Sequence, residues 1–184
     1  MQRPDEVFDV VNDRDEILGQ ATRREVHKRG LKHRAVHILL FNLQGELFVQ
    51  KRAPTKDTFP RRYDSSASGH VDSGESYDAC AVRELREELG IEVPLREFVR
   101  KFKINACLDT GWEFVWVYTV RGDYRPHINA GEIEAGEFWD LDRVRDVIDK
   151  HPEQCAPSFS RVVHELLGRG PMSPNDCKAD SSFV

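Results

Sequence analysis

One stretch of the sequence, residues 76–89, constrains the fold more than any other because it is the clearest helix and carries clustered carboxylates. Gly90 follows it, where a glycine commonly ends a helix. At roughly 100° per residue, three glutamates fall within an arc of about 100°: Glu84, Glu87 and Glu88. Aliphatic residues occupy a different face, free to pack on a sheet: Val82, Leu85 and Leu89. The segment therefore predicts a helix with one core-facing side and one acidic side.

The acidic side favours a bound cation. Carboxylates this close repel one another, and like charges four residues apart weaken a helix. Hard oxygen ligands suit Mg²⁺ or Mn²⁺, which prefer carboxylates, water and phosphate oxygens. The alternative is a solvated face laced with Arg83 and Arg86, since surface ion pairs contribute little to stability.

The helix belongs to a longer pattern from Gly69 to Ile91, which reads GHVDSGESYDACAVRELREELGI. This segment resembles the Nudix box, G-x5-E-x7-R-E-U-x-E-E-x-G-U with U aliphatic, at every specified position. From average residue frequencies, the fixed identities would coincide by chance on the order of 10⁻⁸ per starting position. The resemblance implies a Nudix hydrolase of the α/β (α+β) class, with a mixed β-sheet sandwiched between α-helices. It also implies Mg²⁺- or Mn²⁺-dependent cleavage of a diphosphate linkage by water attack at phosphorus.

The same resemblance implies roles for individual residues. The metal ligands are the Gly69 carbonyl and the side chains of Glu84, Glu87 and Glu88. Glu84 is the first choice for the general base, although Nudix enzymes place the base differently. Glu75 and Arg83 form a structural pair between loop and helix. The segment GEIEAGEFWDL is expected to be a loop that supplies a further catalytic acid, Glu132 or Glu134, unless both are ordinary surface residues.

Basic residues ahead of the box are candidate phosphate contacts: Lys51, Arg52, Lys56, Arg61 and Arg62. Arg52 and Lys56 are the preferred substrate-binding pair. For each of them, a solvated loop charge is the alternative.

A wider resemblance, from about residue 8 to 144, is to the Nudix branch that includes isopentenyl-diphosphate isomerase. It rests on LKHRAVHILLFNLQGELFVQKRAPTKDTFP and SSASGH. In the isomerases a cysteine precedes the Gly-His pair, whereas this chain has Ser68, and a hydroxyl is a poor acid-base substitute for a thiol. The isomerase metal-binding histidines match His33 and His70, with His27 one residue off the expected spacing. Hydrolysis is therefore favoured over isomerisation, and His70 is a candidate contact to substrate or metal. A non-catalytic phospholigand-binding module is the third hypothesis.

The pattern along the chain predicts a single domain over residues 1–168, with an N-terminal extension over 1–32 and a flexible tail over 169–184. The extension is expected to hold a hairpin, with strands at 8–11 and 17–20, and a helix at 23–29 ended by Gly30. Further strands are expected at 35–42, 46–51, 97–106 and 113–121, an extended piece at 64–68, and helices at 141–150 and 158–167.

Composition limits the classes of partner that the protein is expected to bind. The formal net charge of −5 argues against a nucleic-acid polymer or an anionic membrane surface. The sequence shows no signal peptide and no apolar run long enough to span a bilayer. Four scattered cysteines, without a Cys-x-x-Cys pair, predict free thiols in a reducing cytoplasm and no cysteine zinc site. The expected partner is a small-molecule diphosphate, and a homodimer is possible.

Overall fold

The computed structural model describes residues 5–168 and 179–180. The strands are β1 Val7–Val11, β2 Ile17–Thr22, β3 His33–Phe41, β4 Leu47–Arg52, β5 Tyr63–Asp64, β6 Ala67–His70, β7 Val99–Ile104, β8 Glu113–Arg121, β9 Ile133–Trp139 and β10 Ala179–Asp180. The helices are α1 Arg23–Arg29, α2 Tyr77–Leu89, α3 Leu141–Lys150 and α4 Pro157–Leu166, with 3₁₀ turns at Leu95–Glu97 and Pro152–Gln154.

The central sheet is mixed, as predicted. Its strand order is β10-β7-β8-β3-β4-β5, with β6 also pairing with β3 and β9 with β4. Strand β3 runs parallel to β8, from the His33–Glu113 pair to the Phe41–Arg121 pair, and the other pairings are antiparallel. This mixed pairing places β3 at the centre of the sheet.

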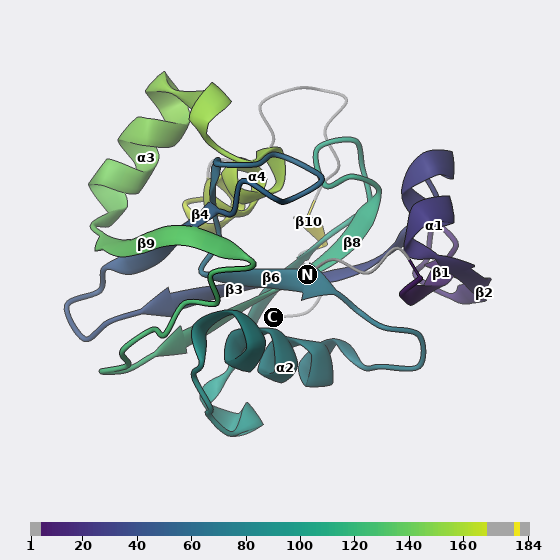
Figure 1. Ribbon diagram of the computed structural model, residues 1–184, viewed down its shortest axis with the longest axis horizontal. Helices are drawn as coiled ribbons and strands as arrows, with labels where there is room; N and C mark the ends of the chain where they lie inside the picture. Colours follow the sequence, from purple (N-terminus) through teal and green to yellow (C-terminus); the bar gives the residue numbers. More distant parts are fainter. Residues whose placement is uncertain (1–4, 169–178, 181–184) are drawn as a thin grey trace.

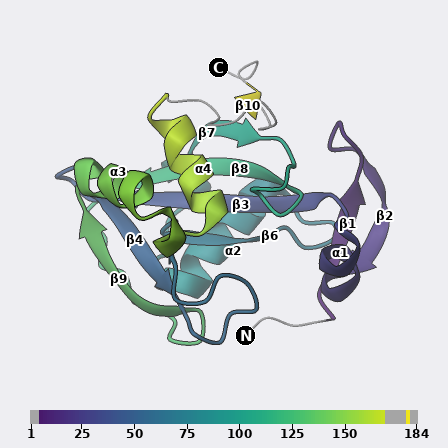
Figure 2. The same cartoon turned by 90° about the horizontal axis from the view of Figure 1, so that it is seen from above.

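Helices cover both faces of the sheet (Figures 1 and 2). Strand β3 shows why, because its side chains alternate between two cores. Val36, Ile38 and Leu40 pack in the core that includes Leu85 and Leu89 of α2. Ala35 and Leu39 pack instead in the core that includes residues of α3 and α4. Helix α2 therefore covers one face of the sheet, and α3 and α4 cover the other.

The N-terminal extension forms the predicted hairpin of β1 and β2, followed by α1. Thr22 and Glu25 make a reciprocal capping box at the start of α1, and Gly30 ends it with φ of 60°. Asp15, in the hairpin turn, joins the extension to the domain: it accepts hydrogen bonds from Arg34 Nε at 2.5 Å and Tyr77 Oη at 2.9 Å. Lys103 Nζ lies 2.5 Å from the same carboxylate.

Two expectations are corrected. The segment after Glu132 is strand β9, not a loop, so Glu134 lies on a strand that pairs with β4. Most β9 side chains between its two buried ends are exposed or partly exposed, so it lacks the alternation that marks a strand. Cys80 and Cys155 are free thiols, but Cys107 is disulfide-bonded, a pairing that sequence spacing did not reveal.

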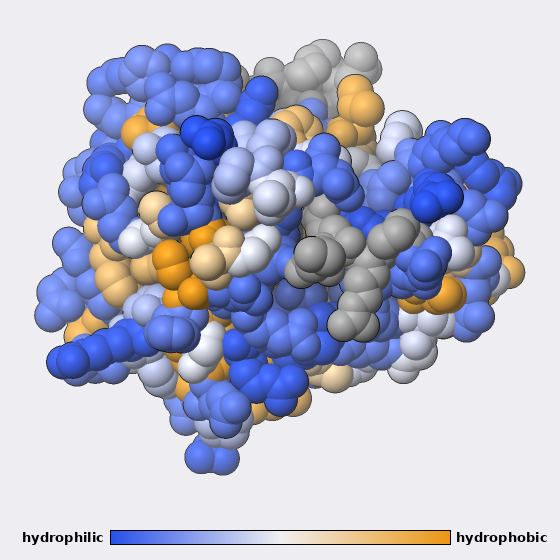
Figure 3. All heavy atoms as spheres, in the orientation of Figure 1, coloured by the Kyte–Doolittle hydropathy of each residue, from blue (hydrophilic) through white to orange (hydrophobic). Residues whose placement is uncertain are grey.

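The predicted flexible tail falls on residues 169–184, which lie outside the described residues except for β10, paired with β7. Within the described part of the chain, no helix is long and apolar enough to cross a membrane. The face shown in Figure 3 is predominantly hydrophilic, with apolar residues in small patches.

Candidate active site

The acidic face of α2 borders a cavity of about 560 Å³. Strands β3 and β6 and the loops over 53–62 and 107–112 line it, together with the N-terminal extension and the first residues of α4. Helix α2 is held rigidly in this position: Ser76 caps its first turn, and Gly90, with φ of 63°, ends it. The site is therefore carried by a capped helix packed on a sheet.

Two of the three glutamates on the acidic face of α2 are buried. Glu84 and Glu88 are 9% and 3% exposed, whereas Glu87 lies on the exposed side of α2. Glu88 Oε2 accepts hydrogen bonds from Gln50 Nε2 at 3.1 Å and from the Ser68 amide at 3.2 Å. Arg83 Nη1 donates to Glu84 Oε1 at 2.6 Å. Protein donors therefore orient both buried carboxylates.

Gly69 is needed for a steric reason. A Cβ added there would lie 2.0 Å from Glu84 Oε1 and 2.1 Å from its Cδ. Gly69 pairs with Val36 in the sheet, and its φ is not in the left-handed region. The glycine therefore provides room for the Glu84 carboxylate rather than an unusual turn.

The electrostatics of this cluster fit a divalent cation. Burial raises the pKa of Glu84, and the nearby charge of Glu88 raises it further. Burial also raises the pKa of Glu88, against the opposing effect of Lys56. A divalent ion would stabilise the ionised form of both groups, and their oxygen donors are the ligands that Mg²⁺ and Mn²⁺ prefer.

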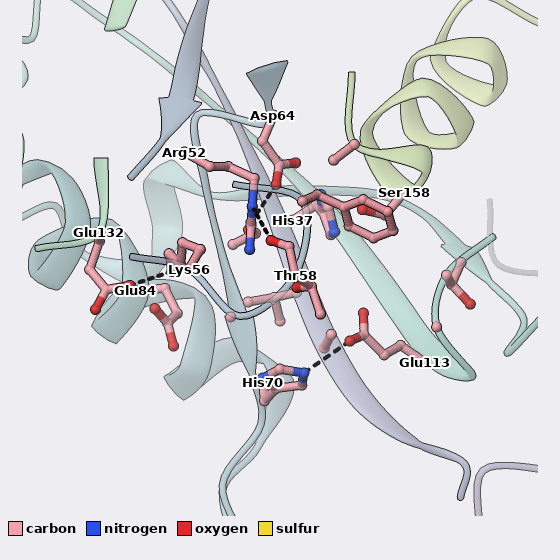
Figure 4. Close-up of a pocket in the computed structure, with 18 of the residues that line it drawn as sticks. His37, Arg52, Lys56, Thr58, Asp64, His70, Glu84, Glu113, Glu132 and Ser158 are labelled. Atoms are coloured by element: carbon pink, nitrogen blue, oxygen red, sulfur yellow. Dashed lines mark hydrogen bonds and ion pairs between the residues drawn. The ribbon is translucent and has the colours of Figure 1, made fainter. Parts of the chain in front are cut away.

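Arg52 and Lys56, the preferred substrate-binding pair, both reach the cavity, but each already has a carboxylate partner (Figure 4). Lys56 Nζ forms an ion pair with Glu132 and lies 3.8 Å from Glu88 Oε1. Arg52 Nη1 donates to Asp64 Oδ2 at 2.7 Å, and its Nε donates to the Thr58 carbonyl at 3.2 Å. The structure thus brings Glu132 beside the box glutamates, with Lys56 between.

Of the remaining basic candidates, Lys51 faces Glu134 at 3.6 Å, and Arg61 is largely exposed. Neither lines the cavity, and nor does Arg62.

The structural pair is present. Arg83 Nε and Nη2 donate to the two oxygens of Glu75 at 2.9 and 2.8 Å, and Nη2 also donates to the His70 carbonyl at 3.0 Å. This bidentate bond ties the loop ahead of α2 to the helix.

A second cluster of ligand-type residues lies in the same cavity. Single ring nitrogens of His27, His33 and His70 all lie within 4.8 Å of one another. Glu113 Oε1 is 2.9 Å from His70 Nε2 and 3.5 Å from His33 Nε2. His33 Nε2 is buried, and among the described residues this contact with Glu113 falls short of a hydrogen bond. His27 belongs to this cluster although its spacing differs by one residue from that of the isomerases, because the turn after α1 places its ring 5.3 Å from that of His33.

The cluster is built to hold neutral imidazoles beside a carboxylate. Burial lowers the pKa of His70 to about 4, so this ring is neutral at pH 7. Burial alone would raise the pKa of Glu113, but the neighbouring rings of His33 and His70 keep it well below its usual value. Neutral imidazole is the form that binds a metal.

Comparison with known proteins places this geometry in a family. The NUDIX domain model matches residues 31–161. The chain belongs to the Nudix family. A crystal structure of a Deinococcus radiodurans protein superposes with a TM-score of 0.79 at 32% identity, covering 87% of this chain and 98% of that one.

Two relatives of this Nudix protein have names that state an activity. A Methanosarcina mazei prenyl-diphosphate phosphatase is 44% identical over 160 residues, 85% of this chain and 92% of the relative. A Photorhabdus laumondii isopentenyl-diphosphate Delta-isomerase 2 is 32% identical over 165 residues, 88% of this chain and 93% of the relative.

The sequence reasoning missed two residues of this Nudix cavity, Arg23 and Glu113. Arg23, in α1, is 7% exposed, and its Nη1 donates to His70 Nδ1 at 3.0 Å. Glu113 opens β8, and the parallel register pairs it with His33. A glutamate at the start of a strand is ordinary, so only the pairing of β3 with β8 identifies Glu113 as a neighbour of the histidines.

Proposed function

We propose that this protein is a Mg²⁺- or Mn²⁺-dependent hydrolase that cleaves a diphosphate linkage in a small organic molecule. The observation that carries the proposal is the pair of buried glutamates, Glu84 and Glu88, on a cavity that also holds Glu132, Lys56 and Arg52. Each glutamate already faces one cation, Arg83 beside Glu84 and Lys56 beside Glu88, but burial still raises the pKa of both carboxyl groups. A divalent ion would stabilise their ionised form.

The proposed ligands are the Gly69 carbonyl with Glu84, Glu87 and Glu88. When bound, the ion neutralises charge on the phosphate oxygens and lowers the pKa of a coordinated water. Glu84, or Glu132 beside it, accepts the proton of the attacking water. The water oxygen bonds to phosphorus while the bond from phosphorus to the bridging oxygen breaks, and that oxygen leaves with the bonding electrons.

The basic side chains of the cavity hold the diphosphate. Arg52 approaches from the end of β4, Lys56 from the loop after it, and Arg23 from the N-terminal extension. Their side chains come from separate elements, so an anion between them would be held from more than one side.

A second metal site is proposed at His27, His33, His70 and Glu113. Three imidazole nitrogens and a carboxylate suit Mn²⁺ or Zn²⁺, and His33 Nε2 is buried 3.5 Å from the carboxylate of Glu113. After treatment with a chelator, the protein should bind one equivalent of Mn²⁺ or Zn²⁺ that is lost in His33→Ala and kept in Glu88→Gln. Equal binding by His33→Ala and the unchanged protein would contradict the second site.

The organic group that we propose first is a prenyl chain, because the Methanosarcina mazei relative is named a prenyl-diphosphate phosphatase. Isomerisation is the second candidate, supported by the name of the Photorhabdus laumondii relative. Ser68 stands against it, since its hydroxyl has a far higher pKa than a thiol and is a weaker acid-base group.

The test is product analysis on a panel of isopentenyl and longer prenyl diphosphates, nucleoside di- and triphosphates, dinucleotide cofactors and nucleotide sugars. Glu84→Gln and Glu88→Gln should each lower metal-dependent turnover by at least 100-fold, the scale of removing a catalytic group, while the fold persists. Glu92→Gln, at an exposed position beyond α2, is the control and should retain activity. Unchanged turnover in Glu88→Gln would refute hydrolysis at this site.

Two further proposals concern the whole molecule, a cytoplasmic location and a possible homodimer. Light scattering on the purified chain tests the dimer directly. A monomer at micromolar concentration would contradict it.

A further inference from the structure

Lys56 occupies an unusual position for a lysine. It lies in the loop between β4 and β5, where its amide donates to the Ala53 carbonyl at 3.2 Å. Its side chain is only 8% exposed and points into the cavity toward Glu132 (Figure 4). Lysine is almost never this buried without a partner, and its partners here are two carboxylates on two different elements, Glu132 before β9 and Glu88 on α2.

The two oxygens of Glu88 differ in their surroundings. Oε2 accepts hydrogen bonds from Gln50 and from the Ser68 amide. Oε1 instead faces Lys56 Nζ at 3.8 Å. The ammonium therefore lies at the oxygen of Glu88 that protein hydrogen bonds leave available to a ligand.

We propose that Lys56 is a built-in counter-cation of the metal cluster, which makes divalent-metal binding and diphosphate binding mutually dependent. This inference rests on the proposed function, because it takes Glu88 as a metal ligand. Without metal, Lys56 offsets part of the charge of Glu88 and Glu132. A divalent ion that binds Glu88 meets the ammonium as a like charge a few ångströms away, which opposes binding.

The diphosphate removes this opposition. An anion bound beside the cluster provides a new partner for the ammonium, so Lys56 can leave Glu88 without losing an ionic contact. By linkage, the anion must then strengthen metal binding by the same factor as the metal strengthens anion binding. The coupling depends on Lys56 having a charge.

The experiment is a titration of Mn²⁺, followed by the electron paramagnetic resonance signal of the free ion, with and without methylene bisphosphonate, a diphosphate that cannot be hydrolysed at its bridge. The variants are Lys56→Met, which removes the charge, and Lys56→Arg, which keeps it. Lys51→Met is the matched control, since Lys51 pairs with Glu134 outside the cavity. Glu88→Gln identifies the part of the binding that belongs to the glutamate cluster.

Without bisphosphonate, Lys56→Met should bind Mn²⁺ about three- to tenfold more tightly, the scale of removing one nearby like charge. Bisphosphonate should tighten Mn²⁺ binding in the unchanged protein and in Lys56→Arg, and much less in Lys56→Met. The metal-free Lys56→Met protein should also melt at a lower temperature, because Glu88 and Glu132 lose the cation between them. Lys51→Met should match the unchanged protein throughout.

Two different failures can be told apart. If Lys56→Met binds Mn²⁺ as weakly as the unchanged protein, or more weakly, while Glu88→Gln removes the part of the binding that belongs to the glutamate cluster, the counter-cation role is wrong and the proposed metal site stands. If Glu88→Gln binds Mn²⁺ as well as the unchanged protein, the proposed function itself fails. Should Lys56→Met not fold, Lys56→Gln replaces it, because its amide keeps a polar contact to the carboxylates without the charge.

Discussion

Replacing Gly69 by alanine should displace the Glu84 carboxylate without replacing it by another group. The variant therefore tests how far activity depends on the position of Glu84. The added methyl carbon would begin 2.0 Å from Glu84 Oε1, whereas ordinary contact starts at 3.4 Å, so the oxygen must move by about 1.4 Å. Glu84 is buried and held by Arg83 at 2.6 Å, which limits the directions in which it can move. Misplacing a catalytic group by about 1 Å costs on the order of 100-fold in rate.

We therefore expect Gly69→Ala to lower kcat/KM by about 100-fold and to weaken Mg²⁺ binding, with the unfolding free energy lowered by about 1–3 kcal/mol, the cost of overpacking a closely packed site. The backbone is not strained by the change, since Gly69 does not have a positive φ. The assay is phosphate release from the best substrate of the panel, beside urea unfolding. Gly19→Ala is the control, because nothing lies within 4 Å of its added carbon. Activity within threefold of the unchanged protein would show that Glu84 finds a productive position elsewhere, and would refute the steric role of Gly69.

Two other predictions concern stability. Because burial raises the folded-state pKa of Glu84 and Glu88 above the ordinary 4.5, the metal-free fold should lose stability, relative to Glu88→Gln, as pH rises above about 4.5. Melting temperatures in a chelator across pH 4.5–9 would check this, Mg²⁺ should remove the difference, and parallel curves for the two proteins would contradict it. Asp15→Asn should lower the unfolding free energy by about 2 kcal/mol, because it leaves two partly buried cations, Arg34 and Lys103, without their shared anion. Urea unfolding measures this against Asp13→Asn, whose carboxylate is exposed. A loss below about 1 kcal/mol would show that Asp15 does not hold the N-terminal extension to the domain.

Local signals predicted much of the fold. The helical period and the stop at Gly90 placed α2 correctly, and the β-prone run over 113–121 is strand β8. Hairpin and capping signals located β1, β2 and α1. These features succeed because each depends on residues within one or two turns of chain, where side-chain spacing alone decides the contacts.

Strand β9 was harder to predict from the sequence. The resemblance to relatives led to the expectation of a loop at β9, and its mostly polar or small side chains, which do not alternate, gave no contrary signal. It is a strand because β4 supplies backbone partners, from the Leu47–Trp139 pair onward. Backbone pairing with a distant strand leaves little trace in side-chain identity, which is the signal that a single sequence offers.

The box in the sequence by itself determined the family and the acidic face of α2, because spacing along a helix fixes which side chains share a side. It did not determine what that face meets. The registers of β3 with β6 and β8 bring His33, His70 and Glu113 together, and the loop after β4 brings Lys56 to Glu88 and Glu132. These contacts join residues tens of positions apart, and packing of the whole domain, rather than any local preference, decides them. The clustering of the carboxylates can therefore be predicted from the sequence. The contact of Lys56 with them, and the gathering of the histidines, are decided by the tertiary structure.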